Sequence, residues 1–218
     1  MSDEAERAVG VGPWPGGPDD WPDDPRLDPE LLAAGDRRNV LDRYRYWTVE
    51  AIVADLDRRR APLHVAIENL EHDFNIGSIV RTANAFNVAG VHVVGRRRWN
   101  RRGAMVTDRY LHVHHHPEPA DLAAWARAAG VVVVGIDNVP GSTPLETTGL
   151  PRDCVLVLGS EGPGLSEAML AECAQVRHIT QYGSTRSMNA GAAGAIAMYA
   201  WAGAHLSVPP LDRSAEGG

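Results

Sequence analysis

Cys154-Val-Leu-Val-Leu158, followed by Gly159-Ser-Glu-Gly-Pro-Gly-Leu-Ser166, is the stretch on which the fold of this chain depends. Its first five residues form an apolar run typical of a buried strand, and the glycines after it let the backbone approach a ligand closely. A second strand and turn follow within about 30 residues: a strand ends at Ile179, and Ser187-Met-Asn-Ala-Gly-Ala-Ala-Gly194 opens a final helix. Small ligands bind where the carboxyl ends of such strands meet in an open sheet. The two turns therefore predict a ligand site in the last third of the chain.

The sequence before this stretch alternates between strand-like and helix-like segments. Alternation of this kind predicts an α/β fold, in which a mainly parallel sheet carries helices on both faces. Apolar residues at helical spacing from Asn39 to Arg60 predict one amphipathic helix that leads into the domain. Further strands are predicted at 63–67, 91–94 and 131–136, and further helices at about 76–86 and 119–129.

Length and composition fit one cytoplasmic domain. The 218 residues are enough for a single well-buried domain, and a hydrophobic content of 44% is that of a globular protein. No apolar run approaches the roughly 20 residues of a membrane-spanning helix, and the N-terminus lacks a signal-peptide pattern, so we expect no membrane partner. Cys154 and Cys173 lack metal or redox spacing. We expect both to be reduced and the protein to be cytoplasmic.

The net charge of −7 is unevenly distributed, because residues 1–30 hold nine acids and two arginines. We predict an acidic, mobile tail over residues 1–36, a helical extension over 37–60, one domain over 61–207 and a C-terminal tail over 208–218. Within the domain the arginines cluster after the second predicted strand, and a local basic patch can bind nucleic acid whatever the net charge. The candidates for this contact are Arg96, Arg97, Arg98, Arg101 and Arg102.

Alternation along a strand would place His112, His114 and His116 on one face. Three histidines suggest a metal site, but no acidic or cysteine partner flanks them, and zinc sites usually draw ligands from separated segments. We therefore predict no metal site, and we favour a pH-sensitive or RNA-facing edge strand.

Three segments resemble, in order and spacing, the three motifs of SpoU/TrmH-type RNA ribose methyltransferases of the SPOUT superfamily. Together they cover about residues 61–205. Three positions differ from the family pattern: Asn87 stands where glycine is usual, Thr180 where proline is usual, and Ala190-Gly191 replaces a valine–serine pair. The segments are Asn69-x5-Asn75-Ile-Gly77-x3-Arg81-Thr-Ala-x-Ala-Phe86, Leu158-Gly-Ser-Glu-Gly-Pro-Gly-Leu165, and Ser187-Met-Asn189 opening an alanine-rich helix.

The resemblance implies a fold, a cofactor and a reaction. The C-terminal segment would be threaded through a loop as a trefoil knot, and S-adenosylmethionine would bind in that knot. Its methyl group would pass to a ribose 2′-hydroxyl of tRNA or rRNA, with the RNA target left open. The working unit would be a homodimer, formed through the final helix and the motif-one helix. The implied cofactor positions are Leu158, Gly159, Ser160, Gly162, Gly164, Ile179, Met188, Asn189 and Ala193.

A 2′-hydroxyl is a poor nucleophile near neutral pH, so the site must stabilise developing negative charge and align the attack. Arg81 suits that role by its charge, and we expect it to hold a substrate phosphate and stabilise the forming alkoxide. The proton would leave through Arg81 itself or through water. The alternative for Arg81 is a surface arginine paired with Glu68 or Asp73. The residues that would orient Arg81 and the ribose are Asn75, Glu161, Ser187 and Asn189.

Two other functional classes stay open. A catalytically silent relative that binds S-adenosylmethionine or RNA is disfavoured because Asn75, Arg81, Glu161 and Asn189 are all intact. A Rossmann-type dinucleotide enzyme would need Gly-x-Gly-x-x-Gly after the first strand of the domain. Glu68-Asn69-Leu70 stands there instead.

Overall fold

A computed structural model describes residues 10–69, 75–99, 101–159 and 163–207, and of residues 101 and 102 it describes the backbone alone. The chain divides into two compact units at the step from Arg59 to Arg60. Within the described residues no helix is both long enough and apolar enough to span a membrane.

In its described residues, 10–59, the first unit contains two short α-helices, α1 (Pro29–Ala34) and α2 (Val49–Asp57), and two 3-10 turns, η1 (Pro18–Asp20) and η2 (Asp42–Tyr44). The predicted single helix from Asn39 to Arg60 is wrong in its first half. Tyr46 has a φ of 62°, a left-handed conformation that interrupts a helix. Thr48 then caps α2, because its hydroxyl accepts a hydrogen bond from the Ala51 amide at 3.1 Å.

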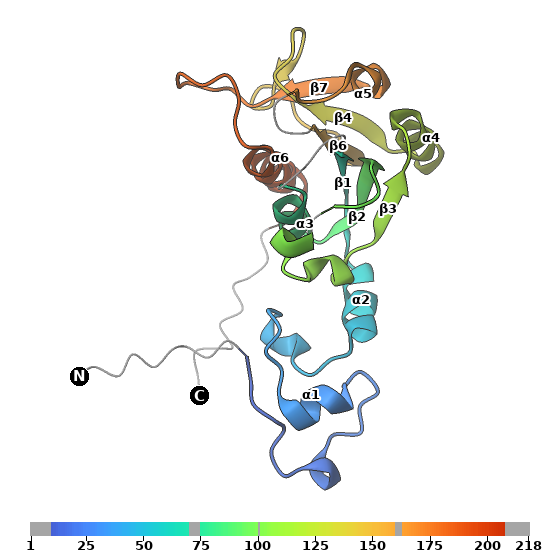
Figure 1. Ribbon diagram of the computed structural model, residues 1–218, viewed down its shortest axis with the longest axis vertical. Helices are drawn as coiled ribbons and strands as arrows, with labels where there is room; N and C mark the ends of the chain where they lie inside the picture. Colours follow the sequence, from blue (N-terminus) through green and yellow to red (C-terminus); the bar gives the residue numbers. More distant parts are fainter. Residues whose placement is uncertain (1–9, 70–74, 100, 160–162, 208–218) are drawn as a thin grey trace, which may run out of the picture. The chain divides into compact units, whose positions relative to one another are not determined.

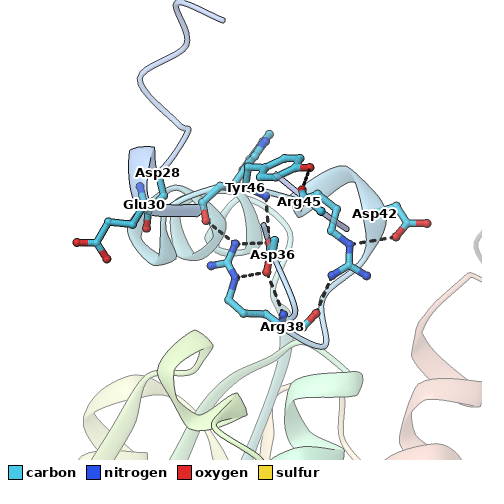
Figure 2. A network of polar contacts seen from close by, with 9 residues as sticks. Asp28, Glu30, Asp36, Arg38, Asp42, Arg45 and Tyr46 are labelled. Atoms are coloured by element: carbon cyan, nitrogen blue, oxygen red, sulfur yellow. Dashed lines mark hydrogen bonds and ion pairs between the residues drawn. The ribbon is translucent and has the colours of Figure 1, made fainter. Parts of the chain in front are cut away.

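A buried carboxylate holds these turns together (Figure 2). Asp36 is fully buried and accepts hydrogen bonds from the Arg38 guanidinium at 2.7 and 2.9 Å and from the Tyr46 amide at 3.0 Å. Burial by itself raises the pKa of Asp36, but the hydrogen bonds from Arg38 and Tyr46 outweigh it and hold that pKa at about 2. Arg45 donates to the Arg38 carbonyl at 2.7 Å. Because α1 and Asp36 belong to the predicted tail, part of residues 1–36 is folded. The mobility of the tail stays a prediction.

The second unit is built on a seven-stranded sheet with the order β3-β2-β1-β6-β4-β7-β5, and every pairing in it is parallel. The central strand β6 pairs with β1 (Val65 opposite Leu156) and with β4 (Val134 opposite Leu156). The apolar run predicted as a buried strand is thus the middle of the sheet, and all its residues are buried. The strands are β1 (Ala61–Asn69), β2 (Val88–Gly95), β3 (Val113–His116), β4 (Val132–Ile136), β5 (Thr143–Pro144), β6 (Cys154–Leu158) and β7 (Gln175–His178).

Helices cover both faces of this sheet, as predicted (Figure 1). On one face, Ile79 of α3 (Ile76–Ala85) and Met198 of α6 (Ala190–His205) belong to one core with Leu156. On the other face, α4 (Pro119–Ala129) and α5 (Glu167–Glu172) share a second core with alternate strand residues such as Val155. Two 3-10 turns, η3 (Arg101–Ala104) and η4 (Thr107–Tyr110), connect β2 to β3. The α/β prediction with a mainly parallel sheet is confirmed.

Two details follow from the backbone. Asn87, which replaces the usual glycine after α3, has a φ of 48°, a left-handed conformation that asparagine tolerates. Gly194 lets α6 lie directly on the sheet, because a Cβ there would come within 2.8 Å of the Cδ1 of Leu158. Gly191 allows a similar approach to α3, because a Cβ there would come within 2.5 Å of the Ser78 hydroxyl, so small residues at the start of α6 serve close packing on both β6 and α3.

Candidate active site

A cavity of about 710 Å³ lies at the carboxyl ends of β4, β6 and β7. It brings together every predicted cofactor position that the structure describes. Ser160, Glu161 and Gly162 are predicted site residues that lie outside the described residues. The lining includes Leu158, Gly159, Gly164, Ile179, Ser187, Met188, Asn189 and Ala193, together with residues that the sequence did not single out, among them Asp137, His178 and Arg186.

The glycines after β6 are required by close approach of the backbone. A Cβ on Gly159 would overlap the backbone of Gly164, so this loop doubles back on itself. Gly164 has a φ of 75°, and a Cβ there would overlap the carboxylate of Asp137. That carboxylate, at the end of β4, accepts hydrogen bonds from the amides of Leu165 and Asn138, each at 2.7 Å. Asp137 thus fixes the loop from the neighbouring strand.

The far end of the same loop is tied to β1. Glu68 is fully buried and accepts hydrogen bonds from the Ser166 amide at 2.8 Å and the Ser166 hydroxyl at 2.5 Å. The Ser166 hydroxyl also caps α5 by accepting from the Met169 amide at 3.0 Å. Glu68 is therefore bound to Ser166 and not to Arg81, and Asp73, the other partner considered for Arg81, lies outside the described residues. Nothing in the local sequence signals this contact between residues 98 positions apart.

Two predicted site residues meet directly. Asn75 and Asn189 stand at the N-termini of α3 and α6, and the Asn189 side-chain amide donates to the Asn75 side-chain carbonyl at 2.9 Å. Asn189 also caps its own helix, because its oxygen accepts from the Ala192 amide at 3.1 Å. The Asn75 side chain forms no capping hydrogen bond to α3, and its carbonyl accepts from Asn189 instead. Asn189 lines the cavity, so this contact connects the cavity to α3.

Arg81 lies on α3, six residues after Asn75, and its side chain is exposed. It does not line the cavity. Within the described part of the chain, no hydrogen bond or ion pair holds its guanidinium. The structure therefore places Arg81 on the helix that the asparagine contact connects to the cavity, but it does not bring the guanidinium against the cavity lining.

The Glu146 carboxylate binds Thr180, the residue that stands where the family pattern has proline. Thr180 donates its amide to Glu146 at 3.1 Å and its hydroxyl to the same carboxylate at 3.0 Å. Proline has no amide hydrogen to donate, so this contact requires the departure from the family pattern. A hydrogen bond from the backbone of Glu146 itself and those from Thr180 lower the pKa of Glu146. The two hydrogen bonds from Thr180 to Glu146 fix the chain directly after Ile179, which lines the cavity.

Ser142 orients the ring of His178 beside the cavity. The Ser142 hydroxyl donates its one proton to the Val139 carbonyl at 2.7 Å, and the same oxygen lies 2.9 Å from Nδ1 of His178. Nδ1 must then carry a hydrogen and donate it to the Ser142 oxygen. His178 lines the cavity, so this network fixes the orientation of one ring of the lining.

The predicted basic loop is held by Asn69, at the end of β1. The Asn69 side-chain amide donates to the carbonyls of Arg96 and Arg98 at 2.6 and 3.1 Å. The side chains of residues 96–98 are exposed. The backbone of Gly103 packs against Gly77 of α3, since a Cβ on Gly103 would lie 3.2 Å from the Gly77 Cα. The loop therefore lies beside the helix that carries Arg81.

The histidines of β3 belong to a cluster that also includes β1 and β2. Nδ1 of His64 lies 3.1 Å from Nε2 of His92, and Nδ1 of His92 lies 2.9 Å from Nε2 of His116, with Trp125 packed on the His92 ring. Burial lowers the pKa of His92 to about 2 and that of His64 to about 4. β3 is an edge strand as predicted, and His114 stacks on His92. No group of three potential ligands suited to a metal occurs among the residues described.

Comparison with known proteins agrees with this geometry. Residues 62–199 match the model of the SpoU rRNA Methylase family. A Mycolicibacterium vanbaalenii protein described as an uncharacterized tRNA/rRNA methyltransferase is 31% identical over 186 residues, which cover 80% of this chain and 58% of that protein. The chain spans about half to three fifths of the length of such curated relatives.

Two solved structures are similar to the chain. The SpoU methyltransferase AviRb from Streptomyces viridochromogenes, in complex with AdoMet, is 28% identical with a TM-score of 0.57, covering 66% of this chain and 57% of that one. The AdoMet-bound rRNA methyltransferase from Sinorhizobium meliloti is 26% identical with a TM-score of 0.60, covering 71% and 61%. With the family model matched over more than half of its length, the chain belongs to the SpoU rRNA methylase family, the SpoU/TrmH type that its three motifs predicted.

Proposed function

We propose that the chain is an S-adenosylmethionine-dependent RNA methyltransferase that methylates a ribose 2′-hydroxyl of tRNA or rRNA. The observation that carries this proposal is the hydrogen bond between Asn189 and Asn75. It connects the cavity formed by the second and third motifs to the helix of the first motif, which bears Arg81. Family membership and the relatives described as tRNA/rRNA methyltransferases support the choice of RNA.

The cavity fits S-adenosylmethionine in size and chemistry. Its volume of about 710 Å³ lies within the usual range for small-ligand sites. Apolar side chains such as Leu158 and Met188 suit the adenine ring of the cofactor, and His178 can form hydrogen bonds with its polar groups. AviRb and the S. meliloti enzyme were each solved with this cofactor. When bound, the cofactor supplies an electrophilic methyl group.

The remaining chemistry belongs to the chain. Arg81 would hold a substrate phosphate and stabilise the negative charge that develops on the 2′-oxygen. Asn75 and Asn189 would orient Arg81 and the ribose, as would Ser187 and Glu161. The proton would leave through water or through Arg81 itself, although the high pKa of a guanidinium makes the latter demanding.

We also propose that the C-terminal segment is threaded through a loop as a trefoil knot. β7 lies two strands beyond β6, yet α6 returns to contact α3, the helix that follows β1. The chain must therefore cross over the ends of β4 and β6 between these elements. A crystal structure with a fully traced backbone would test this proposal. When the two ends of the traced chain are pulled apart in a calculation, a knotted chain tightens into a knot and an unknotted chain straightens.

The proposed function is tested in two steps. Calorimetry with S-adenosylmethionine should detect binding, and incubation with total tRNA and rRNA plus labelled cofactor should yield labelled RNA. A 2′-O-methylated nucleotide cannot form the cyclic phosphate of alkaline hydrolysis, so the label should appear in alkali-resistant dinucleotides. Label in single nucleotides would refute the ribose assignment. Cofactor binding without transfer to any RNA would favour the catalytically silent alternative.

The arginine loop is the proposed phosphate contact. Replacing Arg97 and Arg98 with serine should weaken RNA binding and reduce the slope of log affinity against log salt by roughly 1.4–1.8, about 0.7–0.9 for each lost phosphate contact. Arg127→Ser is the matched control, because Arg127 is exposed on α4 and faces Glu172 at 3.6 Å. An unchanged slope in the double variant would contradict the assignment. Arg101 and Arg102 would contribute in the same way.

The homodimer is proposed through α6. Ile196, Tyr199 and Leu206 expose 42%, 73% and 40% of their surface, which a symmetric partner would cover. Sedimentation equilibrium at micromolar concentration should give twice the chain mass of 23.5 kDa. A monomer with full activity would refute the proposal. The cytoplasmic location also stays a proposal, which rests on reduced cysteines.

A further inference from the structure

The loop between β7 and α6 carries an exposed aromatic ring. Tyr182 exposes 93% of its surface, whereas the next most exposed large apolar side chain among the described residues, Tyr199, exposes 73%. The neighbours Gly183, Ser184 and Thr185 are exposed as well. In Figure 1 this loop, in orange-red, extends away from the sheet. A ring held in water in this way is available to a ligand.

The base of the loop is fixed although its tip is exposed. On the strand side, Glu146 holds both the amide and the hydroxyl of Thr180. On the helix side, the Arg186 carbonyl receives side-chain amides from Asn138 at 3.4 Å and from Gln181 at 3.5 Å. Tyr182 therefore projects from a short segment that Glu146 holds on the strand side and that longer contacts hold on the helix side. Tethering lowers the entropy that the loop loses when it binds a ligand.

The loop also forms the rim of the cavity. Gln181, Arg186 and Ser187 line the cavity, whereas Tyr182 does not. A ribose that delivers its 2′-hydroxyl to this cavity must pass this rim, so the nucleotides beside it come within reach of the loop. Arg186 adds an exposed positive charge at the same place.

We propose that Tyr182 is a stacking platform for an unpaired base of the RNA substrate, next to the methylated nucleotide, with Arg186 close to the connecting phosphate. This proposal rests on the proposed function. A base inside a duplex has both faces covered, so a protein ring can stack only on an unpaired nucleotide of a loop, bulge or end. The substrate site is therefore single-stranded at the target. A protein partner fits less well, because one tyrosine among glycine and hydroxyl residues offers no apolar core for an interface.

Substitution of Tyr182 tests the platform. Base–aromatic stacking is worth about 1–3 kcal/mol, so Tyr182→Ala should weaken RNA binding about 5- to 150-fold. Tyr182→Phe and Tyr182→Trp keep the ring and should stay within about threefold of the wild type. Because Tyr182 does not line the cavity, all three variants should bind S-adenosylmethionine with unchanged affinity, which separates stacking from a general loss of structure.

Cross-linking locates the contact even before the RNA target has been identified. Trypsin cleaves after Arg177 and Arg186 and releases residues 178–186, in which Tyr182 is the one phenol. Ultraviolet irradiation with total tRNA and rRNA should attach nucleotides to this peptide in the wild type and not in Tyr182→Ala. Once the target is mapped, annealing a complementary oligonucleotide over it should abolish both the adduct and methylation.

The outcomes distinguish the two proposals. If the wild type binds and methylates RNA while Tyr182→Ala does so with unchanged affinity, the platform is wrong and the proposed function stands. Efficient methylation of the annealed duplex would show that the target is not single-stranded, while the proposed function would stand. If the wild type binds neither cofactor nor RNA, the proposed function is wrong, and the inference about Tyr182 is wrong as well.

Discussion

The packing of α6 on β6 can be tested by placing the same substitution at two positions of one helix. Gly194→Ala and Gly203→Ala each add a methyl group to α6, and alanine gains about 0.5–1 kcal/mol over glycine in a helix. At Gly203 the new Cβ meets nothing within 4 Å, so only the gain remains. At Gly194 it would lie 2.8 Å from Cδ1 of Leu158, a side chain that is only 2% exposed.

A Cβ on Gly194 would force the nearly buried Leu158 side chain to shift, and overpacking of a core costs about 1–3 kcal/mol. Gly194→Ala should therefore be less stable than Gly203→Ala by that same 1–3 kcal/mol, since the helix gain cancels between them. For a domain of this size each kcal/mol shifts the melting temperature by about 2–4 °C, which gives a difference of about 2–12 °C. Gly203→Ala should melt above the wild type.

Two measurements check this pair. Calorimetric melting gives the stability difference, and titration with S-adenosylmethionine gives the cofactor affinity. Because Leu158 lines the cavity, Gly194→Ala should also bind the cofactor more weakly, whereas Gly203→Ala should bind it as the wild type does. Equal melting temperatures and equal affinities for the two variants would refute the placement of α6 on β6.

Three further predictions follow from single contacts. Arg81→Ala should abolish methyl transfer and leave cofactor affinity within a few-fold, because Arg81 does not line the cavity; near wild-type incorporation of labelled methyl would contradict its catalytic role. Glu68→Gln should lower the free energy of unfolding by about 1–3 kcal/mol and weaken cofactor binding, because an amide group would face the two donors of Ser166; urea unfolding that matches the wild type would show that the carboxylate is dispensable. Burial lowers the pKa of His64 to about 4 and of His92 to about 2, so the unfolded chain takes up protons first as the pH drops. The free energy of unfolding should therefore fall between about pH 6.5 and pH 4. The urea midpoint should fall less in His64→Gln, and an identical pH dependence in wild type and variant would contradict the role of His64.

The sequence by itself determined most elements of the second unit and part of the lining of the cavity. An uninterrupted apolar run such as Cys154–Leu158 is typical of a strand covered on both faces, so its burial in the sheet was predictable. The predicted helix at residues 119–129 matches α4 to the residue. Glycines such as Gly159 and Gly164 mark where backbone passes close to other atoms. These signals are local, because periodicity and the absence of a side chain are properties of a short segment.

Only the tertiary structure decided which distant residues meet. Strand order brings Glu68 to Ser166, 98 positions away, and the two N-cap asparagines together across 114 positions, and no local pattern encodes such a pair. The same holds for His92, which joins the β3 histidines to His64 through sheet register.

The N-terminal helix and Thr180 show where local patterns mislead. Helical spacing from Asn39 to Arg60 was outweighed by the buried Asp36, which binds the Tyr46 amide and holds a left-handed turn in the middle of the predicted helix. Thr180 stood out only as a missing proline, until the fold placed the Glu146 carboxylate against its amide. In both cases a carboxylate from elsewhere in the chain satisfies a backbone N–H, and a contact of that kind exists only once the chain has folded.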